Sequence, residues 1–452
     1  MPIITLPMNR IRLTSIALAI LLCVQCLPGY GVNAQRSNST ASTAAPIADV
    51  APPPTGAHLP PNYPFPQHTV YQTGIIQPSR YSQAQLDQHA STYYFNWINH
   101  YLWQRGNEAD GHPRYRISSG WSIYDATVSE GQGYGMLFTA LMAGEDVDAR
   151  KYFNGLYEFV IDHPTTNNLY MMDWYVPEHE GNDQWGNDSA FDGDCDIAYA
   201  LLLAEKQWGN NTRFDYRAEA VNRITALKTV IGPNSKLPMF GDWVDPSGSP
   251  WNEHSSRPSD FMIGHFRAFA IATGDPFWDD VIDACLITSA QVSHDFSLIP
   301  NLLPDFIMEE LPGATTHKPA YPYFLEGSND GNYGWNALRY PIRYTGDAIF
   351  SGDTRTLQPM RDISLWIHSQ TLGDPLGLAA GYDMNGVPLY GGPSYAPEFS
   401  CGFAVAAMTD PNMQIWMDDL YDSFYISSLG YYSDSWVMLS MLLLSGNWWL
   451  PY

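Results

Sequence analysis

Residues 191–204 read FDGDCDIAYALLLA, an apolar stretch that begins with three aspartates, Asp192, Asp194 and Asp196. From position 197 onward the apolar residues recur at helical spacing. Aspartate at such a boundary is typical of a helix N-cap, because its carboxylate accepts the free N–H groups of the first turn. A calcium-binding loop is the alternative, but the closing glutamate and the full loop length are missing. The stretch therefore predicts a helix with carboxylates at its start.

The pattern of a polar start followed by an apolar helix recurs along the chain, and alternating strand-like runs are few. Helices are expected at residues 84–103, 133–142, 152–161, 197–208, 218–231, 261–272, 280–292, 362–371 and 433–444. No sequence repeat of fixed period is present, which argues against a solenoid. The sequence therefore predicts an all-α fold of paired helices. If alternate helices run parallel, their acidic starts meet on one face.

A second motif, TVSEGQGYGM at residues 127–136, also has the form of a helix start. Ser129 and Gln132 have capping-box spacing, which places Glu130 at the first helical position. The three glycines are poor helix formers and are expected to leave room for a close neighbour. Glu130 either complements the helix dipole or acts as a general acid. The second role requires burial or a nearby carboxylate to hold its proton against the dipole.

Two further motifs place acids and amides in loops or at helix starts. SRPSDFM at residues 256–262 contains Asp260, and FLEGSNDG at residues 324–331 contains Glu326 and Asp330. NALRYP, which contains Asn336 and Arg339, follows at residues 336–341. Loops of this composition carry function more often than packing, although most loop acids are simply solvated.

The N-terminal region has the features of an export signal. Arg10 and Arg12 precede a short apolar stretch, and small residues before position 35 suit cleavage. We expect a signal peptide at residues 1–34, a disordered linker rich in Ser, Thr, Ala and Pro at residues 35–67, and a catalytic domain at residues 68–452. A membrane anchor is the alternative for the first segment. Secretion without stable membrane association is expected.

Composition limits the class of protein. The chain has 452 residues, 45% of them hydrophobic, and a net charge of −25. Such acidity argues against nucleic-acid binding, because phosphates are repelled. After signal removal Cys195, Cys285 and Cys401 remain, without metal-type spacing, and are expected to be buried thiols. We expect no metal ion and no cofactor. We expect the protein to be a monomer.

The four motifs resemble those of glycoside hydrolase family 8. SEGQGYGM at residues 129–136 is similar to the family segment that carries the proton donor, and residues 192–208 are similar to the family signature with Phe191 in place of a small residue. The RPSDFM and NALRYP segments also match, in the same order, so the resemblance covers residues 80–450. It implies an (α/α)6 barrel with six inner and six outer helices and a cleft at the N-terminal ends of the inner ones.

The resemblance also implies hydrolysis with inversion, with Glu130 as general acid and Asp192 holding the sugar at the cleavage point. Many members have Asp where this chain has Asn336, and an amide cannot take a proton from water. The subgroup with Asn uses a glutamate in the preceding loop, which implies Glu326 as base, with Asp330 as the alternative. Asn336, Asp260 and Arg339 are then expected to bind substrate or water.

The expected activity is endo-acting hydrolysis of β-1,4-glucan or mixed-linkage β-glucan. A chitosanase of the same fold is the alternative, and a non-catalytic carbohydrate-binding protein on a decayed barrel is another. A terpenoid-type all-α enzyme lacks support, because no Asp-rich metal motif lies within a helix. Trp121, Tyr134, Trp174 and Trp243 are the expected sugar-stacking residues, with core packing as the alternative for each.

Overall fold

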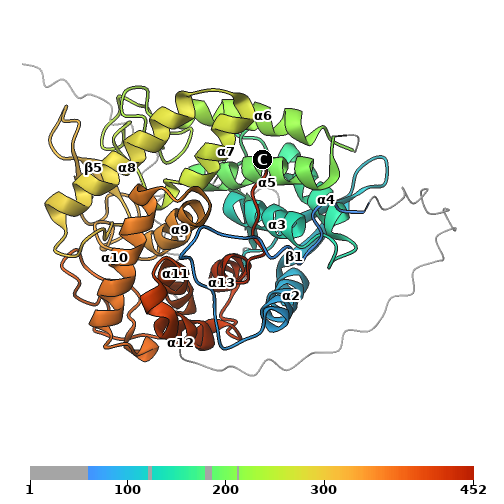
Figure 1. The fold of residues 1–452 in the computed structure, drawn as a ribbon. Helices are drawn as coiled ribbons and strands as arrows, with labels where there is room; N and C mark the ends of the chain where they lie inside the picture. The colour runs from blue at the N-terminus through green and yellow to red at the C-terminus, as the bar shows by residue number, and fades with distance from the viewer. Residues whose placement is uncertain (1–59, 121–124, 179–185, 211–212) are drawn as a thin grey trace, which may run out of the picture.

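The computed structural model describes residues 60–120, 125–178, 186–210 and 213–452. Within them twelve α-helices alternate between an inner and an outer position (Figure 1). The inner helices are α3 (Ser129–Leu141), α5 (Phe191–Trp208), α7 (Ile263–Thr273), α9 (Tyr340–Ser351), α11 (Pro397–Ala407) and α13 (Tyr431–Leu444). The outer helices are α2 (Gln83–Tyr101), α4 (Ala149–Asp162), α6 (Tyr216–Leu227), α8 (Phe277–Phe296), α10 (Thr354–Gln370) and α12 (Gln414–Phe424).

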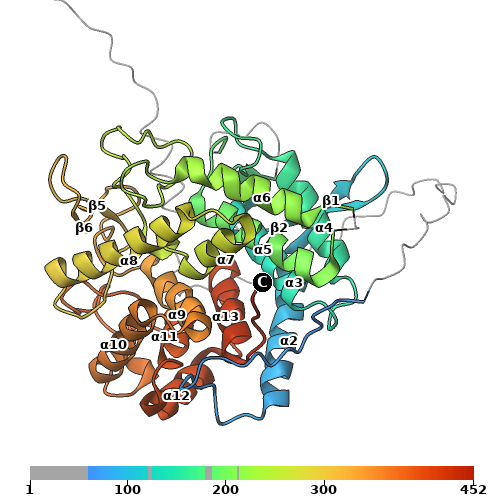
Figure 2. The same cartoon turned by 45° about the horizontal axis from the view of Figure 1, so that its top comes forward.

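The six inner helices form a closed ring. Each contacts the next in the order α3, α5, α7, α9, α11 and α13, and α13 returns to α3. Five outer helices pack against the inner helix that follows or precedes them in the chain, as α4 does against α3 and α10 against α9, while α2 packs against α13 and so joins the two ends of the chain. Figure 2 shows α13 within the ring and α2 outside it. The fold is the predicted (α/α)6 barrel.

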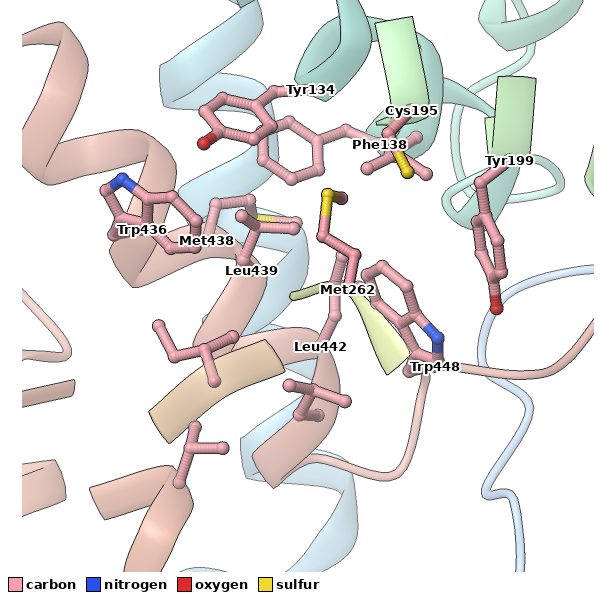
Figure 3. Packing of buried hydrophobic residues seen from close by; sticks show 14 of the residues in the cluster. Tyr134, Phe138, Cys195, Tyr199, Met262, Trp436, Met438, Leu439, Leu442 and Trp448 are labelled. Carbon is pink, nitrogen blue, oxygen red and sulfur yellow. The ribbon is translucent and has the colours of Figure 1, made fainter. Parts of the chain in front are cut away.

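The inner helices are buried on almost every side, which explains their composition. In α13 and α3 nearly all residues are buried, and the hydrophobic side chains belong to one large core cluster. Figure 3 shows part of this cluster, where Trp436 and Leu439 of α13 face Tyr134 and Phe138 of α3. Burying one such side chain contributes about 1.5–3 kcal/mol, so the centre of the barrel supplies most of the packing energy. The helix expected at residues 433–444 is thus a core helix.

Three short two-stranded sheets lie outside the barrel helices. β1 (Leu102–Asn107) pairs with β2 (Pro113–Ile117), β3 (Ala126–Val128) with β4 (Tyr175–Pro177), and β5 (Ile307–Glu309) with β6 (His317–Pro319), all antiparallel. The chain enters α3 directly from β3, so this pairing fixes the start of the helix that carries Glu130. No described helix is both long and apolar enough to cross a bilayer.

A segment that we name the N-terminal strap, residues 60–76, runs across the C-terminal ends of five inner helices. Its N–H groups donate to the carbonyls of Gln207, Ala143, Gly446, Ile349 and Met408, which lie at the ends of α5, α3, α13, α9 and α11. Carbonyls at helix ends have no partner within the helix, so the strap satisfies groups that would otherwise remain unpaired.

The strap corrects the predicted domain boundary at residue 67. Phe65 is buried in the main core, and the ring of Tyr63 stacks on Trp449 at 4.9 Å between centroids. The Pro-rich composition of residues 60–67 suggested a linker, but two aromatic side chains anchor this part to the barrel. The predicted signal peptide and the rest of the predicted linker lie outside the described residues.

Candidate active site

Glycine in α3 and α5 allows the two acid-bearing helix starts to touch. A Cβ on Gly193 would lie 2.3 Å from Ser129 Oγ and 2.7 Å from the backbone nitrogen of Glu130. A Cβ on Gly133 would lie 2.8 Å from the Cβ of Asp196. The motif glycines therefore leave room for close neighbours, as expected: Gly133 faces the first turns of α5, whereas Gly131 faces Tyr431 and Gly135 faces Ile117.

The predicted capping box does not form. Gln132 is fully buried, and its amide bonds the backbone of Ile117, Tyr115 and Leu156 instead. These bonds tie β2 and α4 to α3, so Gln132 anchors the helix sideways rather than capping it. Glu130 is the second residue of α3.

Arg339, which precedes α9, connects four of the predicted site residues. Its Nη1 donates to Glu130 Oε1 at 3.2 Å and to Asp192 Oδ2 in a very short contact. Its Nη2 donates to Asn336 Oδ1 at 2.9 Å and lies 3.7 Å from Asp260 Oδ1. The guanidinium is 3% exposed, whereas the Glu130 side chain is 15% exposed. Arg339 thus lies at the buried bottom of the site, whereas Glu130 is partly exposed at its surface.

Glu326 joins the same network through Asn336. The Asn336 amide donates Nδ2–H to Glu326 Oε2 at 2.8 Å and accepts from Arg339 through Oδ1. Glu130, Arg339, Asn336 and Glu326 therefore form one continuous chain of hydrogen bonds. The fixed orientation of the amide follows from these two partners, a donor on one side and an acceptor on the other.

Two buried aspartates fix the segments that carry Glu326 and Asn336. Asp330 accepts the N–H groups of Leu325 at 2.8 Å, Glu326 at 2.9 Å and Gly327 at 2.6 Å. Asp305 Oδ1 accepts the N–H groups of Gly334 and Asn336, each at 3.0 Å, and of Ala337 at 2.6 Å. Asp330 is thus occupied with the backbone of the loop, and the carboxylate that this loop presents is Glu326.

Burial and neighbouring charge oppose one another at the acid pair. Burial raises the pKa of Glu130, the Arg339 guanidinium lowers it, and the Asp192 charge raises it again, with a net increase. At Asp192 burial also favours the neutral form, but Arg339 and Arg257 outweigh it and hold the pKa below its usual value. The pKa values of the two neighbouring carboxyls are therefore shifted in opposite directions: Asp192 stays ionised, while Glu130 retains its proton more readily.

The pKa values of Glu326 and Asp260 are also raised by burial. Arg257 and the amide of Asn336 partly counter this effect at Glu326. At Asp260 burial, opposed by Arg257, raises the pKa to about 6. Asp260 Oδ1 has no hydrogen-bond partner among the described atoms. The guanidiniums of Arg257 and Arg339 each lie 3.7 Å from the Asp260 carboxylate, which is too far for a hydrogen bond.

The predicted sugar-stacking residues have different surroundings. Trp174 and Trp243 are partly exposed. The backbone carbonyl of Trp174 accepts the N–H of Ser129 at the start of α3, and the Trp243 side chain packs in a small cluster with Phe324 and Leu325 of the Glu326 loop. Both therefore lie beside segments that carry an acid of the site. Trp121 lies outside the described residues.

The expectation that Tyr134 stacks on sugar is wrong. Its ring is completely buried in the core and lies edge-on to Trp436 at 5.4 Å, so no face is free for a ligand (Figure 3). Its hydroxyl instead donates to Glu130 Oε1 at 2.6 Å. One helical turn separates the two residues, a spacing that is visible in the sequence.

The comparisons with known proteins agree with this geometry. The model of glycosyl hydrolases family 8 matches residues 72–326. The chain belongs to this family. A β-glucanase from Niallia circulans is 38% identical over 86% of this chain and 92% of its own length. An endoglucanase from Bacillus sp. (strain KSM-330) is 35% identical over 86% of this chain and 82% of its own.

A solved structure of a β-1,3-1,4-glucanase from Paenibacillus sp. X4 matches this family 8 chain with a TM-score of 0.80 and 38% identity, over 86% of this chain and 100% of the other. A cold-adapted family 8 xylanase matches with a TM-score of 0.66 and 18% identity, over 84% of this chain and 98% of the other. This likeness supports the fold alone. The protein is therefore a glycoside hydrolase of family 8, with relatives of the endoglucanase and β-glucanase type.

Three residues of this family 8 site were not assigned from the sequence. Arg257 Nη1 lies 3.5 Å from Asp192 Oδ2, and Arg257 also lowers the pKa of Glu326. It therefore places a positive charge close to both Asp192 and Glu326. Trp335, partly exposed, immediately precedes Asn336. Asp305 holds that segment from thirty residues away. Arg257 lies within the RPSDFM motif and Trp335 directly precedes the NALRYP motif, so both could have been found from the motifs, whereas nothing in the sequence around Asp305 singles it out.

Proposed function

We propose that this protein is an inverting endo-glucanase that hydrolyses β-1,4-glucan or mixed-linkage β-glucan, with Glu130 as general acid and Glu326 as general base. The observation that supports this assignment most strongly is the hydrogen-bond chain from Glu130 through Arg339 and Asn336 to Glu326. It links two partly exposed carboxyls from distant parts of the sequence to one rigid, buried support.

In the proposed reaction Glu130 donates its proton to the glycosidic oxygen as the bond to the anomeric carbon breaks. A water molecule attacks that carbon from the opposite face and transfers a proton to Glu326. Inversion requires the two carboxyls to stand about 6.5–9.5 Å apart, with room for the water. Asp192, ionised beside Glu130, holds the sugar hydroxyls at the cleavage point and favours the protonated form of the acid.

The assignment of substrate rests on relatives and on the exposed aromatics. The names of the similar proteins are β-glucanase, endoglucanase and β-1,3-1,4-glucanase. Trp174 and Trp243 offer ring faces beside the two acids, and such faces stack on sugar rings. We also propose that the N-terminal segment directs export of the protein, because polysaccharide substrates lie outside the cell. We further propose that the protein acts as a monomer.

The decisive experiment measures products on carboxymethyl-cellulose, lichenan, chitosan and xylan in parallel. We expect hydrolysis of the first two, with the α-anomer appearing first in NMR spectra of the products. Glu130→Gln and Glu326→Gln should each lower kcat by several orders of magnitude. Cleavage of chitosan alone would identify a chitosanase, and the β-anomer as first product would refute inversion.

Asp330→Asn is the matched control for the base. The amide oxygen can still accept the N–H groups of Leu325 and Glu326, although the bond from Gly327 N–H is lost, so the variant removes the ability of Asp330 to take a proton while it keeps most of the hold on the backbone. If Asp330→Asn abolished activity with an unchanged fold while Glu326→Gln remained active, the base would be Asp330.

A further inference from the structure

Two exposed tyrosines, one within the Glu326 loop and one hydrogen-bonded to it, have a strained backbone. Tyr323 has φ of 62° and Tyr390 has φ of 54°, both in the left-handed region. Their side chains are 74% and 56% exposed. A bulky residue in this region costs about 1–3 kcal/mol, and glycine would adopt the same backbone without strain. An exposed ring contributes little packing energy to offset this cost.

The loop around Tyr323 is otherwise firmly anchored. Phe324, the next residue, is buried, and its carbonyl accepts Trp251 Nε1–H at 2.9 Å. The N–H of Tyr323 donates to Gly327 O at 2.7 Å, which closes a turn around Glu326. The backbone thus directs Phe324 inward and leaves Tyr323 in solvent, three residues before the proposed base.

Tyr390 is connected to the same turn from another part of the chain. Asn329 donates Nδ2–H to the Tyr390 hydroxyl at 3.0 Å. Tyr321, 47% exposed, packs edge-on to Phe324 at 5.3 Å. Three exposed phenol rings therefore belong to the segment that presents Glu326 or are bonded to it, whereas Trp174 and Tyr134 are bonded to the start of α3, which carries Glu130.

We propose that Tyr323 and Tyr390 form an additional sugar-binding surface, which stacks on glucose units of a β-glucan chain beyond the unit held at Asp192. This inference rests on the proposed function. The class of ligand follows from the chemistry: a phenol ring offers a flat apolar face and a hydroxyl, which match the C–H face and the hydroxyl groups of a glucose ring. Strained backbone of this kind clusters at active sites and at residues that clamp a ligand.

Such a surface predicts a dependence on chain length. A chain of six glucose units that occupies the cleavage point can also reach the tyrosines, whereas a chain of four makes fewer contacts there. We expect Tyr323→Ala to lower the ratio of kcat/KM for cellohexaose over cellotetraose by about tenfold, the effect of losing one well-stacked aromatic side chain. Tyr323→Phe keeps the ring and should restore most of the ratio.

Tyr452→Ala is the matched control. Tyr452 is 47% exposed, and its carbonyl accepts Lys206 Nζ–H near the C-terminal end of α5. Asp192 lies near the other end of this helix, 14 residues from Lys206 and about 21 Å away along the helix axis. The ratio for Tyr452→Ala should equal that of the wild type.

Tyr323→Gly separates a binding role from a structural one. Glycine relieves the strain, so the melting temperature should stay the same or rise while the ratio falls as for alanine. An unchanged ratio in Tyr323→Ala, or an equal loss on both oligosaccharides, would overturn the sugar-binding surface and leave the proposed function standing. Failure of the wild type to cleave any β-glucan would overturn the proposed function and this inference together.

Discussion

The side-chain amide of Asn336 donates a hydrogen bond to Oε2 of Glu326 across 2.8 Å. This contact orients the carboxylate and favours its ionised form. Asn336→Asp would replace the donor with a second carboxyl at the same distance, and two such groups cannot both ionise easily. The acidic limb of the kcat/KM profile should move up by about one pH unit or more.

Asn336→Ala serves as the control, because it removes the donor without adding charge. It should lower kcat with a smaller shift of the acidic limb. Identical pH profiles for the Asp and Ala variants would mean that Glu326 is not the group whose ionisation limits the rate at low pH.

A second prediction concerns the hydroxyl of Tyr134, which donates to Glu130 Oε1 at 2.6 Å. The bond stabilises the ionised acid and lowers its pKa, so Tyr134→Phe should raise the pKa of Glu130 further. A general acid works while it is protonated, and the basic limb of kcat/KM should therefore move to higher pH by about half a unit or more. The buried ring is retained, so thermal unfolding should change little. A basic limb shifted downward would contradict this role.

Asp305 provides a third test, of stability and geometry together. Its Oδ1 accepts three backbone N–H groups, and burial raises its pKa well above the usual range. An amide resembles the neutral carboxyl, so Asp305→Asn should nearly match the wild type in stability and kcat. Asp305→Ala leaves the donors unpaired and should cost about 2–4 kcal/mol in urea unfolding. Equal stability of both variants would refute the role of these bonds.

The fourth prediction concerns Asp194 in the first turn of α5. Its Oδ1 accepts Met172 N–H at 2.8 Å, and burial raises its pKa to about 8. The folded protein therefore keeps a proton that the unfolded chain loses near pH 4. Stability contributed by this group falls as pH rises from about 4 to about 8 and is level above that.

Asp194→Asn should remove this dependence, because the amide has no proton to lose. The free energy of unfolding of the variant should exceed that of the wild type most at pH 8 and least at pH 4. A parallel pair of stability curves across this range would show that Asp194 is ionised in the folded protein.

Much of the barrel was predictable because its helices have regular polar starts and long apolar faces. The nine expected helical segments all correspond to helices of the structure, with ends shifted by up to eight residues, most at the start of α10. Helices α9, α11 and α12 were missed. α9 begins with Tyr340-Pro341 and contains Gly346, which are poor helix signals, and α11 is apolar on all sides, so it lacks the one-sided pattern that marks a surface helix.

The acids of the site were predictable from motifs, but their supports were not. Glu130 and Asp192 stand at helix starts, where sequence signals are strong. Asp305 and Asp330 act on backbone N–H groups, which any sequence supplies, so only the folded arrangement identifies their partners. Tyr134 was misassigned because an aromatic residue in a site motif can serve through its hydroxyl while its ring belongs to the core.

The N-terminal strap crosses the ends of the inner helices that lie away from Glu130 and Asp192. Whatever precedes Pro60 in the chain therefore joins the molecule on the face opposite the reacting groups. An affinity tag, a surface anchor or a second module fused ahead of that residue can immobilise the protein and leave the entrance for long polymers unobstructed. The same fusion placed in the 320–327 loop would stand directly in the path of the substrate.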